Sequence, residues 1–151
     1  MRALHADADN IRTLFSRAMS DMYRAEVPQY GTLMELVSEV NRATLQQSEQ
    51  LRESLERSDE LERLSLERHG AIRLGRPEEL FNVRRVFAVM GMHPVGYYDL
   101  SAAGVPVHAT AFRPIDDAAL RRNPFRVFTS LLRLELIEDD ALRAAAQRIL
   151  G

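Results

Sequence analysis

Hydrophobic residues in the first part of the chain recur at the three- and four-residue spacing of amphipathic helices. One stripe runs from Ile11 to Met22 after an aspartate-rich start, and Val27-Pro28 interrupts it. A second stripe runs from Leu33 to Ala43, and a more polar stretch with a thin leucine stripe follows it. We therefore predict a helical N-terminal segment over residues 1–63.

At Leu64 the spacing of apolar positions changes to a period of two, which is typical of a strand. The sequence then favours a helix near residues 76–90, with a proline and two glutamates at its start and Gly91 at its end. Three further segments favour strands, and they cover residues 92–100, 105–114 and 125–137.

The predicted order from residue 64 is strand, helix, strand, strand, strand, and we assign this βαβββ module to residues 64–137. Such a unit forms a half-open sheet with one helix on its outer face, and its open edge is one that a second copy would complete. Residues 138–151 favour a C-terminal helix, and the chain ends inside this pattern as a truncated helix would. The predicted fold class is α+β, with all three segments in one compact domain.

The composition narrows the function classes. The chain has 151 residues, 46% of them hydrophobic, and its net charge of −2 gives no sign of a nucleic-acid or membrane partner. The absence of cysteine and lysine excludes thiol catalysis, cysteine-ligated metals and lysine Schiff bases from this chain. Because the sequence shows neither a signal-peptide pattern nor a membrane-length apolar run, we expect a soluble, cytoplasmic protein.

The first predicted strand carries the main candidate for chemistry. His69 and Arg73 fall on the same side of it, with only Ala71 between them, and positions four apart in a strand are separated by about 13 Å. A neutral imidazole is a good ligand for a redox-active divalent metal, and a guanidinium binds a carboxylate through two parallel hydrogen bonds. The pair therefore suits a small acid held between a metal and an arginine.

Two other interpretations stay open from the residues alone. In one, His69 is a half-buried strand residue bonded to a neighbouring carbonyl, and Arg73 pairs with Glu67. In the other, His69, His108 and Glu135 form a facial triad of two histidines and one carboxylate. The spacing of the three residues does not fix their convergence.

Four longer stretches resemble the N-terminal part of the 2-oxoadipate dioxygenase/decarboxylase family, also called hydroxyglutarate synthase. These stretches are EVPQYGTLMELVSEVN, LERHGAIRLG, FAVMGMHPVGYYDLSAAGVPVHATAFRP and NPFRVFTSLLRLELI. Members of the family resemble the vicinal-oxygen-chelate superfamily, whose building block is the βαβββ unit. The resemblance therefore implies a vicinal-oxygen-chelate-like half-barrel over the predicted module.

The resemblance also implies an Fe(II)-dependent enzyme of lysine catabolism that converts 2-oxoadipate and oxygen to 2-hydroxyglutarate and carbon dioxide. The histidine of its HGAIR motif, His69 here, would be the first metal ligand, and the arginine, Arg73 here, would anchor the substrate carboxylate. The family's remaining ligands, a histidine and a glutamate, lie in a later part of the longer members. The implied partners are a small 2-oxo dicarboxylic acid and a missing C-terminal half or a second copy.

Two hypotheses of different classes follow from these observations. In the first, the chain is the His69-bearing N-terminal module of such a dioxygenase/decarboxylase. In the second, it is a truncated, non-catalytic vicinal-oxygen-chelate-like binding module that dimerises through its open sheet and holds a dicarboxylate through Arg73. An anaerobic titration with Fe(II) separates the two hypotheses.

Overall fold

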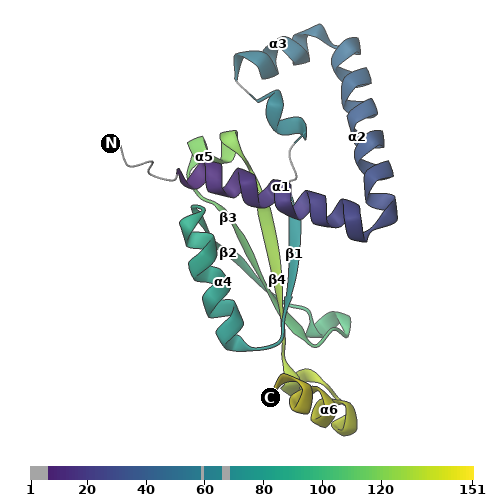
Figure 1. The fold of residues 1–151 in the computed structure, drawn as a ribbon, viewed down its shortest axis with the longest axis vertical. Helices are drawn as coiled ribbons and strands as arrows, with labels where there is room; N and C mark the ends of the chain where they lie inside the picture. The colour runs from purple at the N-terminus through teal and green to yellow at the C-terminus, as the bar shows by residue number, and fades with distance from the viewer. Residues whose placement is uncertain (1–6, 59, 66–68) are drawn as a thin grey trace. The chain divides into compact units, whose positions relative to one another are not determined.

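The computed structural model describes residues 7–58, 60–65 and 69–151 (Figure 1). Its helices are α1 (Ala8–Glu26), α2 (Pro28–Gln47), α3 (Glu49–Arg57), α4 (Pro77–Val89), α5 (Asp117–Arg122) and α6 (Asp140–Leu150). Its strands are β1 (His69–Leu74), β2 (Met92–Asp99), β3 (Val107–Pro114) and β4 (Arg126–Leu132). Short 3-10 helices are η1 (Glu62–Ser65), η2 (Ser101–Ala103) and η3 (Leu134–Leu136).

Helix boundaries follow local capping chemistry. The Asp7 carboxylate accepts a hydrogen bond from the amide of Asp9 and so caps the start of α1. Helix α2 begins at Pro28, earlier than the apolar stripe from Leu33 suggests, because the fixed φ of proline suits the first helical position. Helix α4 is followed by Gly91 in a left-handed conformation, with φ +68°, as the sequence predicts.

The chain divides into two compact units, which we call the helical unit and the sheet unit. The helical unit comprises Met1–Arg68 and Asp116–Phe125, and the sheet unit comprises His69–Ile115 and Arg126–Gly151. These limits differ from the predicted segments. Helix α5 belongs to the helical unit although it lies within the predicted module, and α6 belongs to the sheet unit.

A buried arginine explains why α5 joins the helical unit. Arg12 of α1 is fully buried, and its guanidinium donates to the carbonyl oxygens of Ala119 and Asn123, both at 3.0 Å. It also bonds the Asp9 carboxylate at 2.8 Å. The Ala119 carbonyl also accepts from the amide of Asn123, the C-cap residue of α5, at 3.0 Å. Arg12 adds donors at this C-terminal end, where helix carbonyls lack helical partners, and so ties α5 to α1.

The sheet unit confirms the predicted βαβββ order. Its strands lie in the order β1-β4-β3-β2, with β1 parallel to β4 and the other neighbours antiparallel. Helix α4 lies along one face of this sheet (Figure 1). The rings of Phe87 on α4 and Phe112 on β3 pack edge to face there, with centroids 5.1 Å apart. Met90, Met92 and Val127 are also buried in the core.

Two predicted strand limits are wrong. Leu64 lies in the 3-10 helix η1, and the first strand begins only at His69; residues 66–68 lie outside the described ranges. The last strand ends at Leu132 instead of continuing to residue 137. After it, the Arg133 amide donates to the Pro106 carbonyl, and the chain turns into η3. Among the helices described, none is long and apolar enough to cross a membrane.

Candidate functional site

The register of the sheet places His69 and Arg73 on the same face. Along β1, His69, Ala71 and Arg73 are exposed, while Gly70 and Leu74 are buried under the opposite face. Paired residues of neighbouring strands share a face, so the register of the strand pairs extends this assignment across the sheet. The His69 face therefore consists of His69, Ala71, Arg73, His93, Gly96, Tyr98, Val107, Ala109, Ala111, Arg113, Arg126, Phe128, Ser130 and Leu132. We call the opposite side, on which Phe112 meets α4, the α4 face.

One end of the His69 face carries a basic residue from every strand. His69 pairs with Arg126, and His93 pairs with Arg113. Because Phe112 pairs with Val127 in antiparallel register, Arg113 stands next to Arg126. We call these four residues the basic row. The strand positions of the His69 face include no carboxylate, so this surface attracts anions.

Arg73 stands further along the same face, where it lines a pocket of about 450 Å³. The pocket, here the Arg73 pocket, is lined by Arg73, Leu74, Gly75, Leu100, Val105, Val107, Ser130 and Leu132. Arg73 is exposed, and its guanidinium forms no hydrogen bond or ion pair with any residue of the described ranges. A cation that pairs with none of the described residues, beside an apolar pocket, is suited to an acidic ligand.

The chain after Arg73 is held by two contacts. The Glu79 carboxylate of α4 accepts hydrogen bonds from the amides of Arg76 at 3.1 Å and Gly75 at 2.7 Å. These two bonds, led by the one from Arg76, lower the pKa of Glu79. Gly75 also lies so close to Leu150 of α6 that an added Cβ would be 2.3 Å from its Cδ2. Helices α4 and α6 thus fix the end of the strand that presents Arg73.

His108 lies on the α4 face and is thereby separated from His69. It pairs with Leu131, which in turn pairs with the buried Leu74 of β1. Its Nδ1 contacts the Tyr97 hydroxyl and lies 2.8 Å from the Arg133 guanidinium, and its Nε2 is 3.5 Å from the Asp99 carboxylate. An arginine only donates, so Nδ1 acts as an acceptor toward Arg133 and the ring proton belongs on Nε2, toward Asp99.

Glu135 is bound to the same polar group by Arg133, which forms an ion pair with it. A hydrogen bond from its own backbone amide, and then the one from Arg133, lower the pKa of Glu135. Asp99 has a lowered pKa as well, because the side chain and the backbone amide of Ser101 both donate to it. Both carboxylates are committed to local partners, Asp99 to Ser101 and Glu135 to Arg133.

The structure therefore does not assemble the predicted trio of His69, His108 and Glu135. His108 faces the other side of the sheet, and Glu135 lies in η3 beyond the end of β4. Within the described ranges, no group of three histidine, aspartate or glutamate side chains is placed to hold a metal ion. The physical reason is the strand period, which puts adjacent rows of a sheet on opposite faces.

The structural interpretation of His69 as half-buried is also wrong, because its side chain is exposed. The ion pair proposed for Arg73 involves Glu67, which lies outside the described residues. The sequence patterns did not identify Ser130 as a residue of this site. Phe128, Ser130 and Leu132 alternate along β4 and therefore lie on the same face of the strand. This alternation could have identified Ser130 from the sequence.

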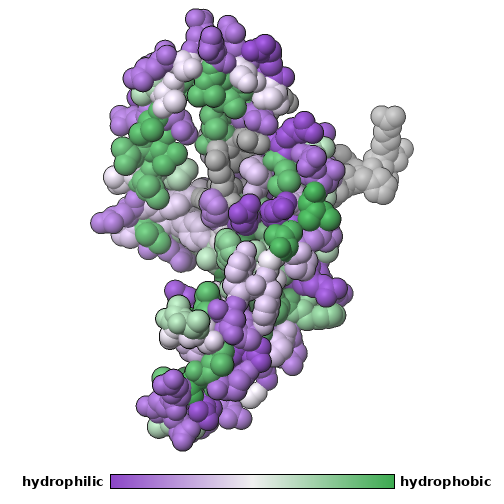
Figure 2. Space-filling model, turned by 180° about the vertical axis from the view of Figure 1, so that it is seen from behind, coloured by the Kyte–Doolittle hydropathy of each residue, from purple (hydrophilic) through white to green (hydrophobic). Residues whose placement is uncertain are grey.

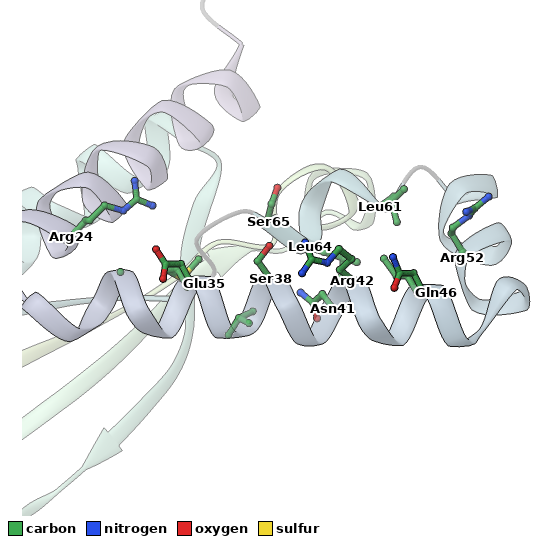
Figure 3. Close-up of a pocket in the computed structure, with 14 residues that line it drawn as sticks. Arg24, Glu35, Ser38, Asn41, Arg42, Gln46, Arg52, Leu61, Leu64 and Ser65 are labelled. Carbon is green, nitrogen blue, oxygen red and sulfur yellow. The ribbon is translucent and has the colours of Figure 1, made fainter.

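The helical unit contains a second cleft of about 860 Å³, which lies between α2 and the segment that returns through η1. Figure 3 shows Ser38, Arg42 and Gln46 of α2 on the side facing Leu61 and Leu64. Helix α2 has no buried residue, and its exposed apolar side chains are Leu33, Leu36, Val37 and Val40. Figure 2 shows how such hydrophobic residues gather in patches among hydrophilic ones.

Comparison with known proteins gives a consistent result. The model of a family described as 2-oxoadipate dioxygenase/decarboxylase matches residues 15–151. A protein of that name from Escherichia coli is 67% identical over 143 residues, which make up 95% of this chain and 32% of the relative. Another of the same name, from Mycobacterium tuberculosis, is 48% identical over 136 residues, or 89% of this chain and 32% of the relative.

Solved structures agree with these sequence matches. The hydroxyglutarate synthase from Pseudomonas putida, crystallised in complex with 2-oxoadipate, has a TM-score of 0.88 at 60% identity over 96% of this chain and 32% of its own. An uncharacterised protein from Shigella flexneri has a TM-score of 0.91 at 66% identity, covering 98% of this chain and 35% of its own. The chain thus spans about a third of the length of the relatives it matches.

Proposed function

Because this chain belongs to the 2-oxoadipate dioxygenase/decarboxylase family, we propose that it is the N-terminal part of an Fe(II)-dependent, cytoplasmic enzyme of lysine catabolism. The enzyme converts 2-oxoadipate and oxygen to 2-hydroxyglutarate and carbon dioxide, a reaction in which all atoms balance without a further reductant. The observation that carries the proposal is the placement of His69 and Arg73 on one open face of β1. The two side chains stand four positions apart on the strand, and no residue of the described ranges pairs with the guanidinium.

Charge on the His69 face supports an anionic substrate. Arg73, Arg113 and Arg126 supply cations along the face, and its strand positions include no carboxylate to compete for them. A 2-oxo dicarboxylic acid carries a negative charge at each end, so both ends are attracted to the same surface. The Arg73 guanidinium would hold the carboxylate distant from the metal through two parallel hydrogen bonds.

Among its described residues, this chain supplies one side chain suited to bind the metal. His69 is an exposed imidazole on the anion-attracting face, and imidazole suits a divalent iron. In the part of the chain that the structure describes, no second and third ligand converge with it. We therefore propose that the region by which the relatives are longer supplies the remaining ligands.

Bound iron would supply the activation of oxygen and the oxidative decarboxylation. The residues of this chain bind and orient the acid: Arg73 fixes one carboxylate, and the spacing along β1 directs the 2-oxo end toward His69. The methyl group of Ala71 leaves room between them, while Phe128 beside it offers an apolar surface to the methylene groups.

A chimera tests the proposal. The matching segment of the Escherichia coli relative would be replaced by this chain, and oxygen uptake with 2-oxoadipate would be measured beside the formation of 2-hydroxyglutarate. We expect activity in the chimera and its loss in the His69→Ala variant, with Arg84→Ala on the exposed side of α4 as the matched control. Full activity in His69→Ala would contradict the proposal.

The second candidate function, a non-catalytic dimeric binding module, is favoured by the two open edges of the sheet. Within the described residues, β1 and β2 each pair on one side only. Sedimentation of the isolated chain, together with anaerobic Fe(II) titration, separates the candidates. Stable dimers that bind no Fe(II) at His69 would favour the binding module, and Fe(II)-dependent broadening of His69 resonances would favour the oxygenase.

A further inference from the structure

The Arg73 pocket joins a polar end to an apolar end on the His69 face. Arg73 and Ser130 are register partners on the parallel strands β1 and β4, so their backbones are about 4.8 Å apart. Val107 and Leu132 are also register partners and form the next row along the same face. Leu100 and Val105, from the connection between β2 and β3, extend the aliphatic wall.

Two polar groups at this pocket have no partner among the residues that the structure describes. Neither the Arg73 guanidinium nor the Ser130 hydroxyl bonds another residue of the described ranges. Polar groups that are partly withdrawn from water are normally satisfied by hydrogen bonds. A cation and a hydroxyl side by side without such bonds, at a pocket of about 450 Å³, are placed for a ligand that accepts from both.

We propose that Ser130 is a second donor to the carboxylate held by Arg73, and that Val107 and Leu132 limit the chain length of the acid. This inference rests on the proposed function and names a positioning residue and a specificity wall for it. A carboxylate offers about four lone-pair directions, of which a guanidinium fork uses two, so the Ser130 hydroxyl can take a third.

The wall acts through desolvation. An acid longer than the span from His69 to Arg73 would push its second carboxylate past the guanidinium, against Val107 and Leu132. Burying a charge against aliphatic side chains without a hydrogen bond is costly, so the longer acid binds less well. A shorter acid fails for another reason, because it cannot reach Arg73 and the basic row together.

The test uses the isolated chain without metal and follows amide resonances by NMR during titration with glutarate, adipate and pimelate. Ser130→Ala is expected to weaken adipate binding about tenfold, the usual effect of losing a hydrogen bond to a charged group. Ser130→Thr keeps the hydroxyl and is expected to restore the affinity. Leu132→Ala is expected to improve pimelate relative to adipate about tenfold, as one methylene commonly does.

Val107→Ala serves as the second wall variant if Leu132→Ala does not fold, and Val86→Ala on the exposed side of α4 is the matched control. An unchanged order of the three acids in both wall variants, equal affinity in Ser130→Ala, or no binding of any acid to the wild-type pocket would overturn the inference. None of these variants changes His69. A failure of the proposed oxygenase function would therefore appear in a different experiment, the chimera that carries His69→Ala.

Discussion

His69 and His108 lie on opposite faces of one sheet. His69 pairs with Arg126 of β4, and His108 pairs with Leu131 of the same strand. Arg126 and Leu131 are an odd number of positions apart along β4, so their side chains point to opposite faces. His108 is held there by Tyr97 and Arg133. The two imidazoles therefore cannot ligate one metal ion within this fold.

The first prediction is that His108→Ala leaves metal binding at His69 unchanged. Anaerobic Fe(II) should broaden the amide resonances around His69 equally in the wild-type chain and in His108→Ala, and the broadening should vanish in His69→Ala. Glu135→Gln is expected to behave as His108→Ala, because Glu135 bonds Arg133 beyond the end of β4. Weaker broadening in His108→Ala would show that the faces are assigned wrongly.

The second prediction concerns the geometry of the Arg73 side chain. Arg73→Lys keeps the charge but removes the planar fork, so adipate should bind the isolated chain about tenfold more weakly. Arg73→Gln removes the charge as well and should weaken binding further. Arg84→Lys, on the exposed side of α4, is the control and should bind as the wild type does. Equal binding by Arg73→Lys would mean that only the net charge of the face matters.

The third prediction is a pH dependence. The lowered pKa of Glu79 means that the folded chain binds fewer protons at this carboxylate than the unfolded chain does. Its contribution to stability is complete above the ordinary glutamate pKa of 4.5 and is lost as the pH falls through the lower folded-state value. The Glu79→Gln variant should therefore lose less thermal stability than the wild type between pH 5 and pH 3.

The control for this pH series is Glu78→Gln. Glu78 stands beside Glu79 in the first turn of α4 but bonds no other residue in the described part of the chain. Melting temperatures measured at each pH should follow the wild-type curve in Glu78→Gln. Parallel curves for all three proteins would contradict the role given to the Gly75 and Arg76 amides.

The fourth prediction tests the link between α1 and α5. Replacing the buried Arg12 by methionine keeps most of the volume but removes the guanidinium that donates to the carbonyls of Ala119 and Asn123 and to the Asp9 carboxylate. We expect a loss of about 2–4 kcal/mol in the free energy of unfolding, measured by urea denaturation. Arg17→Met, at an exposed position of the same helix, should change it little.

The sheet unit shows how far pattern reasoning reaches. The period of two from His69 to Leu74 and the caps around Pro77 and Gly91 are local, so they predicted β1 and α4 directly. The predicted limits at Leu64 and residue 137 were wrong because the apolar alternation reaches back to Leu64 in η1 and on through Leu134 and Leu136 in η3, where the backbone makes 3-10 turns. A hydrophobic period does not record where hydrogen bonding to a neighbouring strand stops.

The sequence by itself determined the helices, the βαβββ order and the shared side of His69 and Arg73, because each of these depends on residues close together in the chain. Only the tertiary structure decided that α5 joins α1 through Arg12, that His108 faces away from His69, and that Ser130 stands beside Arg73. These relationships depend on the register between strands and on contacts between distant segments. Both are set by packing, and no local pattern carries them.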